Sequence, residues 1–328
     1  MQTTVVGSYP KIPNRPKPAR YRNAINKRDR GEITDEELAK VGDEVTVEVI
    51  NEQIEAGIDV ITDGQVRWDD DQTYVARRMK GVKIGALQRY LDTNTYFRET
   101  EIVGDLRPSD EPVVLRDWQF AQKNSSKPVK AIIPGPFTLA VHSNDKHYNN
   151  REKLTLAFAT ALRAEVDALV AAGCKHIQVN DPVIVFHKRE SGEYETFAKA
   201  ITVLLDGVKA ETGVYTWFSD CAGILDRMQA LPVNVIGLDF VAGRANWDAI
   251  KGLKFEKKLG FGIVDGRNTR LEGASEIADS IKRITQYVPE DRLYVNPSCG
   301  LEYVPRETAF AKLKVLAEGA RLGEGVPA

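Results

Sequence analysis

The sequence predicts an α/β fold, a (β/α)8 TIM barrel. Eight short apolar runs rich in β-branched residues recur along the chain, and each ends in a polar or glycine-rich turn. Such runs suit strands that are buried on both faces, as in parallel sheets. Helical patterns lie between most of these runs, and this alternation is typical of the barrel. A doubly wound sheet is the alternative, but no glycine fingerprint follows the first run to favour it.

The strands are expected at residues 3–6, 59–62, 130–133, 176–179, 214–218, 235–238, 260–264 and 293–295. One helix is predicted from Leu154, because apolar residues then recur every three or four positions as far as residue 170. Gly173 follows and predicts its end. A second clear helical pattern covers residues 274–287.

About 65 residues separate the second and third expected strands, too many for one crossover helix. Residues 90–98 mix aromatic residues and threonines in the manner of a strand, and residues 107–112 turn the chain. We therefore predict a β-hairpin inserted between strands two and three, within about residues 80–125. No linker divides the sequence, so residues 1–328 are predicted to form a single barrel domain.

Charge and cysteine content narrow the class of protein. The 45 Lys and Arg residues nearly balance the 47 Asp and Glu residues, which argues against binding nucleic acid or a membrane surface. The three cysteines are too few and too scattered for a disulfide framework, so a reducing cytoplasm is expected. No run approaches the roughly 18 apolar residues of a membrane span. The sequence thus predicts a soluble cytoplasmic protein.

Polar side chains follow the expected strands, and in a barrel of this type the carboxyl ends of the strands carry the chemistry. The candidates are Ser8, Gln65, Asn180, Asp181, Ser219, Asp239, Asp265, Asn268 and Cys299. The same residue types also dominate short turns for conformational reasons, so a turn role is the alternative for each one. Taken together, they predict a functional mouth that binds small molecules.

Several motifs, in order along nearly the whole chain, resemble the cobalamin-independent methionine synthase family. They are TTVVGSYP, TDGQVR, LDTNTYFR, PGPFTL, IQVNDP, GLDFVAG, VDGRN and VNPSCGL. The resemblance implies a methyltransferase that moves a methyl group from a folate or corrinoid donor, such as methylcobalamin, to a thiol such as homocysteine. It therefore implies a role in methionine biosynthesis.

The family's catalytic barrel activates the thiol on a zinc ion, held by a His-x-Cys pair after strand five, a Glu after strand six and a Cys after strand eight. Cys299 matches the last ligand, and Asp239 stands where the Glu is expected. The strand-five pair falls on Trp217 and Ser219, and neither is a good zinc ligand. Cys221 would substitute only if the backbone shifted. The resemblance therefore implies an incomplete zinc site made of Cys299 and Asp239.

The family holds the homocysteine amino group with acidic residues after strands two and four. Gln65 and Asn180 match these positions, and both remove a negative charge opposite an ammonium group. Asp181 offsets part of the loss if the register differs by one residue. The residues implied to be catalytic are Asp181, Asp239 and Cys299. Those implied to bind substrate are Ser8, Gln65, Asn180, Ser219, Asp265 and Asn268.

An alternative comes from motifs closer to the family's amino-terminal barrel, which lacks zinc. LDTNTYF, TWF, LDFVAGR and DGRN resemble that half. They imply a non-catalytic, donor-binding partner subunit of a separate zinc-bearing barrel. A third reading is an enzyme of changed chemistry that uses the same mouth on another small substrate.

Two charged segments outside the strand ends each have two interpretations. Three consecutive aspartates at 69–71 resemble a metal-binding cluster, but they precede a helical pattern and are predicted to cap its amino terminus. A basic run could attract an anionic tail such as a folate polyglutamate, or could form a solvated helix face. Its members are Arg67, Arg77, Arg78, Lys80 and Lys83.

Overall fold

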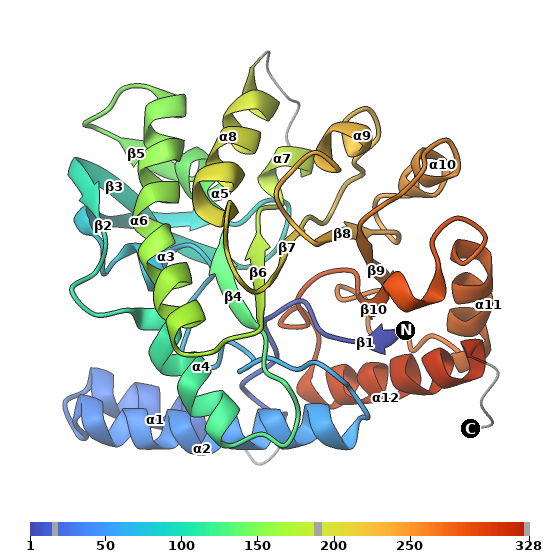
Figure 1. The fold of residues 1–328 in the computed structure, drawn as a ribbon. Helices are drawn as coiled ribbons and strands as arrows, with labels where there is room; N and C mark the ends of the chain where they lie inside the picture. The colour runs from blue at the N-terminus through green and yellow to red at the C-terminus, as the bar shows by residue number, and fades with distance from the viewer. Residues whose placement is uncertain (15–18, 187–191, 325–328) are drawn as a thin grey trace. The chain divides into compact units, whose positions relative to one another are not determined.

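The computed structural model describes residues 1–14, 19–186 and 192–324 (Figure 1). The fold is α/β, and parallel strands alternate with helices as in the predicted (β/α)8 barrel. The chain divides into two compact units. The first comprises Met1–Arg67, Gln119–Val129 and Leu259–Ala328, and the second comprises Trp68–Trp118 and Lys130–Lys258. Among the described residues, no helix is both long and apolar enough to cross a membrane.

The first unit contains three strands in parallel register. β1 (Gln2–Thr3) pairs with β10 (Leu293–Pro297), and β10 pairs with β9 (Lys258–Val264). The second expected strand is reduced to two single bridges, Thr4 with Val60 and Ile61 with Val129. The helices of this unit are α1 (Arg20–Asp29), α2 (Asp35–Glu55), α11 (Ala274–Ile284), the 3-10 turn η1 (Glu290–Arg292) and α12 (Arg306–Gly323).

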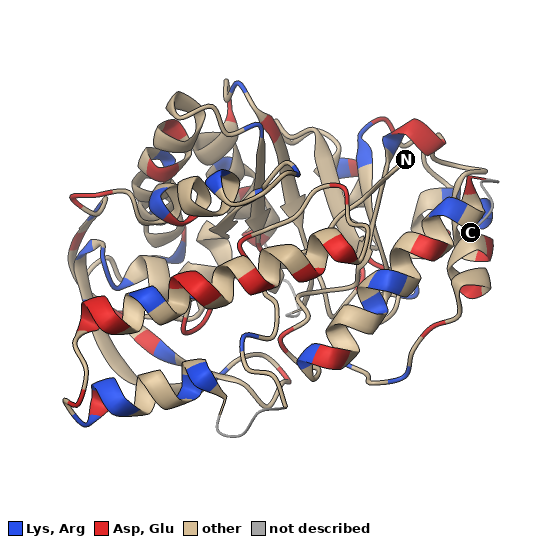
Figure 2. Cartoon of the chain, turned by 90° about the horizontal axis from the view of Figure 1, so that it is seen from below, with Lys and Arg blue, Asp and Glu red and all other residues tan. Residues whose placement is uncertain are grey.

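Helix α2 begins at a capping box. The Glu37 N–H donates to the Thr34 hydroxyl at 3.2 Å, and the Thr34 N–H donates to the Glu37 carboxylate at 2.8 Å. These two bonds satisfy backbone donors that the helix itself leaves unpaired. Acidic and basic segments are interspersed along the helices (Figure 2).

The second unit contains four parallel strands in the order β8-β7-β6-β4. They are β4 (Ala131–Pro134), β6 (His176–Asn180), β7 (Glu211–Tyr215) and β8 (Val235–Asp239). The helices are α3 (Thr73–Ala76), α4 (Val113–Lys123), α5 (Pro136–Val141), α6 (Arg151–Ala171), α7 (Val183–Phe186), α8 (Glu193–Leu205), α9 (Leu225–Met228) and α10 (Asn246–Lys251). The last residues of α4, from Gln119 on, are assigned to the first unit. Gly173 follows α6 with φ 88°, so the predicted helix end is confirmed.

The predicted hairpin insertion is confirmed. β2 (Lys80–Arg89) and β3 (Tyr96–Arg107) pair in antiparallel register, and β5 (Ser143–Asp145) adds in parallel to β3. Of the strand-like segment 90–98, residues 96–98 lie in β3, whereas residues 90–95 make the hairpin turn. Leu91 adopts φ 49°, and the Thr93 hydroxyl donates to the Tyr90 carbonyl at 2.6 Å.

In the second unit, the ring of Tyr215 packs against Gly213 and Gly237. Tyr215 is buried, and a Cβ atom added at Gly237 would overlap its ring, while one at Gly213 would lie 3.2 Å from it. Tyr215 also ends the strand, so the prediction of a strand over residues 214–218 is wrong beyond it. Residues 216–218 are buried but form a loop, in which Phe218 adopts φ 68°.

Candidate functional site

The predicted site residues fall into two groups, one in each unit, and each group is described by itself. Ser8, Gln65, Asp265, Asn268 and Cys299 belong to the first unit. Asn180, Asp181, Ser219 and Asp239 belong to the second.

In the first unit, Ser8 is fixed by the segment that follows β10. The Leu301 N–H donates to the Ser8 carbonyl at 2.9 Å, and the Ser8 hydroxyl donates to the Glu302 carboxylate. Gly300 leaves room for this contact, because an added Cβ would overlap the Ser8 hydroxyl and the Glu302 carboxylate as they are placed. The exit of β10 therefore holds Ser8 by both its main chain and its side chain.

A cleft of about 780 Å³ opens beside this contact. It is lined by Tyr9, Pro10, Lys11, Ile12, Pro13, Asn14, Ala19, Arg22, Glu302 and Val304. The cleft thus combines one carboxylate with the side chains of Lys11 and Arg22. Burial raises the pKa of Glu302, against the opposing effect of its hydrogen bonds and of Lys11.

The remaining first-unit candidates are engaged with their own backbone. Cys299 is buried, and its thiol donates to the Gly300 carbonyl at 3.3 Å. Asp265 accepts the Arg267 N–H at 2.9 Å, and exposed Asn268 accepts the Arg270 N–H at 3.0 Å. In both cases the side chain accepts the backbone N–H two residues later, as is typical of Asp and Asn in turns.

Gln65, the last first-unit candidate, is buried and adopts φ 50°. Its N–H donates to the Asp63 carboxylate at 3.1 Å. This bond and the left-handed backbone show a tight turn immediately after the bridge of the second expected strand.

In the second unit, Asp181 caps α5. Its carboxylate accepts the Phe137 N–H at 3.2 Å, the Thr138 N–H at 2.7 Å and the Thr138 hydroxyl at 2.6 Å. Burial outweighs these bonds and raises the pKa of Asp181 to about 7. Its neighbour Asn180 accepts a 2.6 Å bond from the Gln178 amide. Asp181 is therefore fully buried behind the helix terminus that it stabilises.

Asp239, at the end of β8, organises the loops after β7 and β8. It accepts the N–H groups of Phe218, Val241 and Ala242 at 2.8 to 2.9 Å, which uses both carboxylate oxygens. The half-buried Ser219 follows Phe218 in the first of these loops. Trp217 is buried, and its indole N–H has no hydrogen-bond partner among the described residues.

The residues present do not fit a zinc ion. The described part of the chain has no group of three or more His, Cys, Asp or Glu side chains that could hold a metal. Asp239 is saturated by backbone donors, and the Cys299 thiol bonds to a carbonyl. The positions matching the strand-five ligands are Trp217 and Ser219, and Cys221 lies 3.4 Å from the Thr216 hydroxyl.

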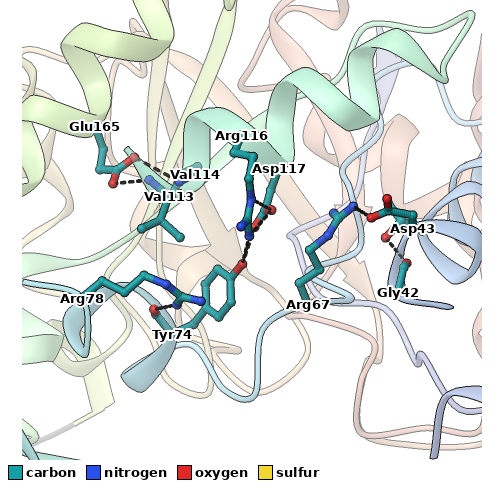
Figure 3. Close-up of polar contacts among 11 residues, drawn as sticks. Gly42, Asp43, Arg67, Tyr74, Arg78, Val113, Val114, Arg116, Asp117 and Glu165 are labelled. Atoms are coloured by element: carbon teal, nitrogen blue, oxygen red, sulfur yellow. Dashed lines mark hydrogen bonds and ion pairs between the residues drawn. The ribbon is translucent and has the colours of Figure 1, made fainter. Parts of the chain in front are cut away.

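The two charged segments are paired locally, and Figure 3 shows the contacts of Arg67 and Arg78. Asp70 accepts the N–H groups of Gln72 and Thr73, so the predicted cap of a helix start is confirmed at α3. In the basic run, Arg78 donates to the Tyr74 carbonyl at 2.5 Å and stacks on its ring. Arg67 pairs with Asp43 (Figure 3). Arg77 pairs with Asp69, and Lys80 pairs with Asp110.

Figure 3 also shows a second buried capping carboxylate. Glu165 accepts the Val113 and Val114 N–H groups at 2.7 and 3.0 Å, at the start of α4. Nearby, the Tyr74 hydroxyl donates to Asp117 at 2.8 Å, and Arg116 contacts both groups. These contacts hold α3 and α4 in place, and burial raises the pKa of Glu165.

Lys11, Arg22 and Glu302 line the cleft but were not among the site residues predicted from the sequence. Glu302 stands three residues after Cys299 in the last motif, VNPSCGL followed by Glu, so its place at a strand exit was a usable signal. Lys11 and Arg22 carried no signal, because a single charged residue in a loop is most often solvated.

Nearly the whole chain is similar to known proteins. The family described as "Cobalamin-independent synthase, Catalytic domain" matches residues 1–322. A protein named methionine synthase from Saccharolobus solfataricus is 30% identical over 326 residues, covering 98% of this chain and 94% of that protein. Its counterpart from Sulfurisphaera tokodaii is 31% identical and covers 98% and 92%.

Solved structures share the fold. A B12-independent methionine synthase from Shewanella sp. W3-18-1, in complex with selenomethionine, has a TM-score of 0.83 at 23% identity, covering 99% of this chain and 98% of that one. A putative vitamin-B12 independent methionine synthase from Listeria monocytogenes has a TM-score of 0.77 at 20% identity, covering 98% and 97%.

Proposed function

This chain belongs to the cobalamin-independent methionine synthase family, and on that premise we propose that it transfers a methyl group to a thiol such as homocysteine, with a folate or corrinoid as donor. The observation that carries the proposal is the cleft beside Ser8, whose lining combines a carboxylate with two basic side chains. An amino acid with a thiol side chain has the charges to match such a lining. The Shewanella relative was solved with selenomethionine, the selenium analogue of methionine, which is the product that methyl transfer to homocysteine would give.

The reaction is a displacement at the methyl carbon. The substrate sulfur, as a thiolate, attacks the methyl group, the new S–C bond forms, and the bond from the methyl group to the donor breaks with its electron pair left on the donor. The thiolate is the required nucleophile, because a neutral thiol reacts poorly. The proposal therefore needs a group that removes the thiol proton.

The setting that we propose is a reducing cytoplasm, with small molecules as ligands. Cys174, Cys221 and Cys299 carry buried thiols rather than disulfides, as suits that compartment. Burial also raises the pKa of the Cys174 thiol to about 11, so this cysteine is inert packing at neutral pH.

A second candidate function is a donor-binding partner of a separate zinc-bearing barrel. Trp217 and Ser219 stand at the strand-five positions, and this observation favours it. The buried indole N–H of Trp217 would gain an acceptor from a bound ligand. In that case the chain binds the methyl donor, and the thiol is activated elsewhere.

The test supplies homocysteine with methyl-labelled methyltetrahydrofolate or with labelled methylcobalamin and measures labelled methionine. We expect product from the purified chain alone with one of these donors. Product that forms only after a zinc-bearing barrel from the same organism is added would replace the first function with the second. Absence of product in both settings, with no binding of either donor or homocysteine, would overturn both.

A further inference from the structure

Glu302 differs from the other candidate acids in what it faces. The carboxylates of Asp181 and Asp239 are buried and occupied by backbone N–H donors. The Cys299 thiol is buried against a carbonyl. Glu302 instead lines the cleft, so among these groups its carboxylate is the one that a bound molecule can reach.

The position of Glu302 is constrained by its neighbours. The Ser8 hydroxyl donates to Oε2, the Leu301 N–H bonds to the Ser8 carbonyl, and Gly300 leaves the space that both side chains use. A base whose side chain is held in one conformation is already positioned to accept a proton from a substrate bound within hydrogen-bond distance.

The charges around Glu302 suit a thiol substrate. Ser8, Tyr303 and Lys11 are the polar groups that act on its carboxylate, and Arg22 lines the same cleft. Burial outweighs them and raises the pKa of Glu302, which makes it a stronger base than an exposed carboxylate. Lys11 and Arg22 favour a neighbouring anion, and cations of this kind lower the pKa of a thiol.

We propose that Glu302 accepts the proton of the thiol substrate and that Lys11 and Arg22 stabilise the thiolate, so that this cleft activates a thiol without a metal ion. In the step, the S–H bond breaks, its electron pair stays on sulfur, and the proton forms an O–H bond on Glu302. The thiolate then displaces the donor from the methyl carbon, and the Glu302 proton passes to the departing donor or to solvent. The inference rests on the proposed function for the methyl step, whereas the proton step needs no turnover.

The test follows the ultraviolet absorbance of the thiolate when homocysteine binds at neutral pH. The wild-type chain should develop this absorbance on binding. Glu302→Gln keeps an acceptor for Ser8 but has no basic carboxylate, so it should bind homocysteine within about threefold and lose the thiolate signal. Glu302→Asp retains a carboxylate and should recover part of that signal. Glu44→Gln, on the exposed side of α2, is the matched control and should behave as the wild type.

A second variant separates the proton acceptor from the stabilising cation. Lys11→Met leaves Glu302 in place, so thiolate should still form but only at higher pH, by about one unit. In turnover, Glu302→Gln should lower kcat by about 100-fold or more with little change in KM. The wild-type pH profile should lose its acidic limb in this variant.

The outcomes are separable from those of the proposed function. A thiolate signal of equal size in Glu302→Gln and the wild type, or homocysteine bound as a neutral thiol by the wild type, would overturn the role of Glu302 while methyl transfer stands. Thiolate formation that depends on Glu302, without methyl transfer from either donor, would support the inference and contradict the proposed reaction. If Glu302→Gln fails to fold, Glu302→Asp decides the matter: a thiolate signal as large as that of the wild type would overturn the role of Glu302, and a weaker signal would support it.

Discussion

The amine of Lys130 lies 4.9 Å from the centroid of the Tyr215 ring, in the buried interior of the second unit. A cation over an aromatic face is attracted to it, but the same burial removes the water that stabilises the charge. The nearest acidic group acting on Lys130 is Glu211, which itself pairs with Lys258 and lies 3.2 Å from His176. Desolvation is the larger effect and lowers the pKa of Lys130 to about 7.

Replacement of Lys130 should therefore change how stability depends on pH. From pH 7 up to the ordinary lysine pKa of 10.5, the unfolded chain binds a proton that the folded chain does not, so the free energy of unfolding rises with pH across this window. Lys130→Met should flatten this rise and stabilise the protein by several kcal/mol, at most about 5, at pH 6. Urea unfolding at pH 6 and pH 9 measures both effects. The exposed substitution Lys254→Met is the control, and parallel curves for wild type and Lys130→Met would contradict the buried amine.

Asp181 should make the free energy of unfolding depend on pH in the opposite direction. Burial raises its pKa from 3.8 to about 7, so the folded chain binds a proton more tightly than the unfolded chain between these values, and the free energy of unfolding falls as pH rises through them. Asp181→Asn should remove this fall. Asp181→Ala should also lose the cap of α5 and cost about 2 kcal/mol, measured at pH 5 and pH 8. Equal stability of Asp181→Ala and wild type at both pH values would contradict the capping role.

Gly237→Ala should destabilise the second unit through Tyr215. The added methyl group would overlap the ring, and overpacking of this kind costs roughly 1–3 kcal/mol. Tyr215→Leu in the same chain should relieve the strain, so the double-mutant cycle should give a favourable coupling energy. Gly252→Ala, where an added Cβ would meet nothing within 4 Å, is the control. A coupling energy of zero would show that the ring does not occupy that space.

Metal content gives a further prediction. Protein purified without chelators should contain far less than one zinc per chain, and a chelator should leave its melting temperature unchanged, because the candidate donors are already engaged. Elemental analysis and thermal unfolding measure these quantities. Near-stoichiometric zinc that disappears in Cys299→Ser would establish an unconventional metal site instead.

Features that depend on neighbouring residues were predictable. The end of α6 at Gly173 and the cap formed by Asp70 each follow from a few adjacent positions. The strand assignment failed at residues 216–218, because buried apolar residues look alike in a strand and in a loop. Phe218 adopts a left-handed backbone while its N–H bonds to Asp239, a partner 21 residues away that no local pattern reveals.

In the candidate site, too, features set by adjacent residues were predictable from the sequence, and features set by distant residues were not. Ser8, Asp239 and Cys299 were singled out because they follow apolar runs, and their contacts within the chain are now described, while their roles in a reaction stay predictions. Glu302 was missed, since its importance comes from a partner at the other end of the sequence. Whether residues 1–328 behave as one domain stays a prediction, for the described chain clusters into two units.

The bond between Ser8 and Glu302 joins positions 294 residues apart. During synthesis on a ribosome, the segment that carries Ser8 is made first, and its partner Glu302 emerges only when most of the chain has been made. The cleft that they share is therefore completed late, after the helices and strands between them have had time to fold. A nascent chain that lacks this segment has no such cleft, so the proposed binding of a thiol there would become possible only as the last helix, α12, is made.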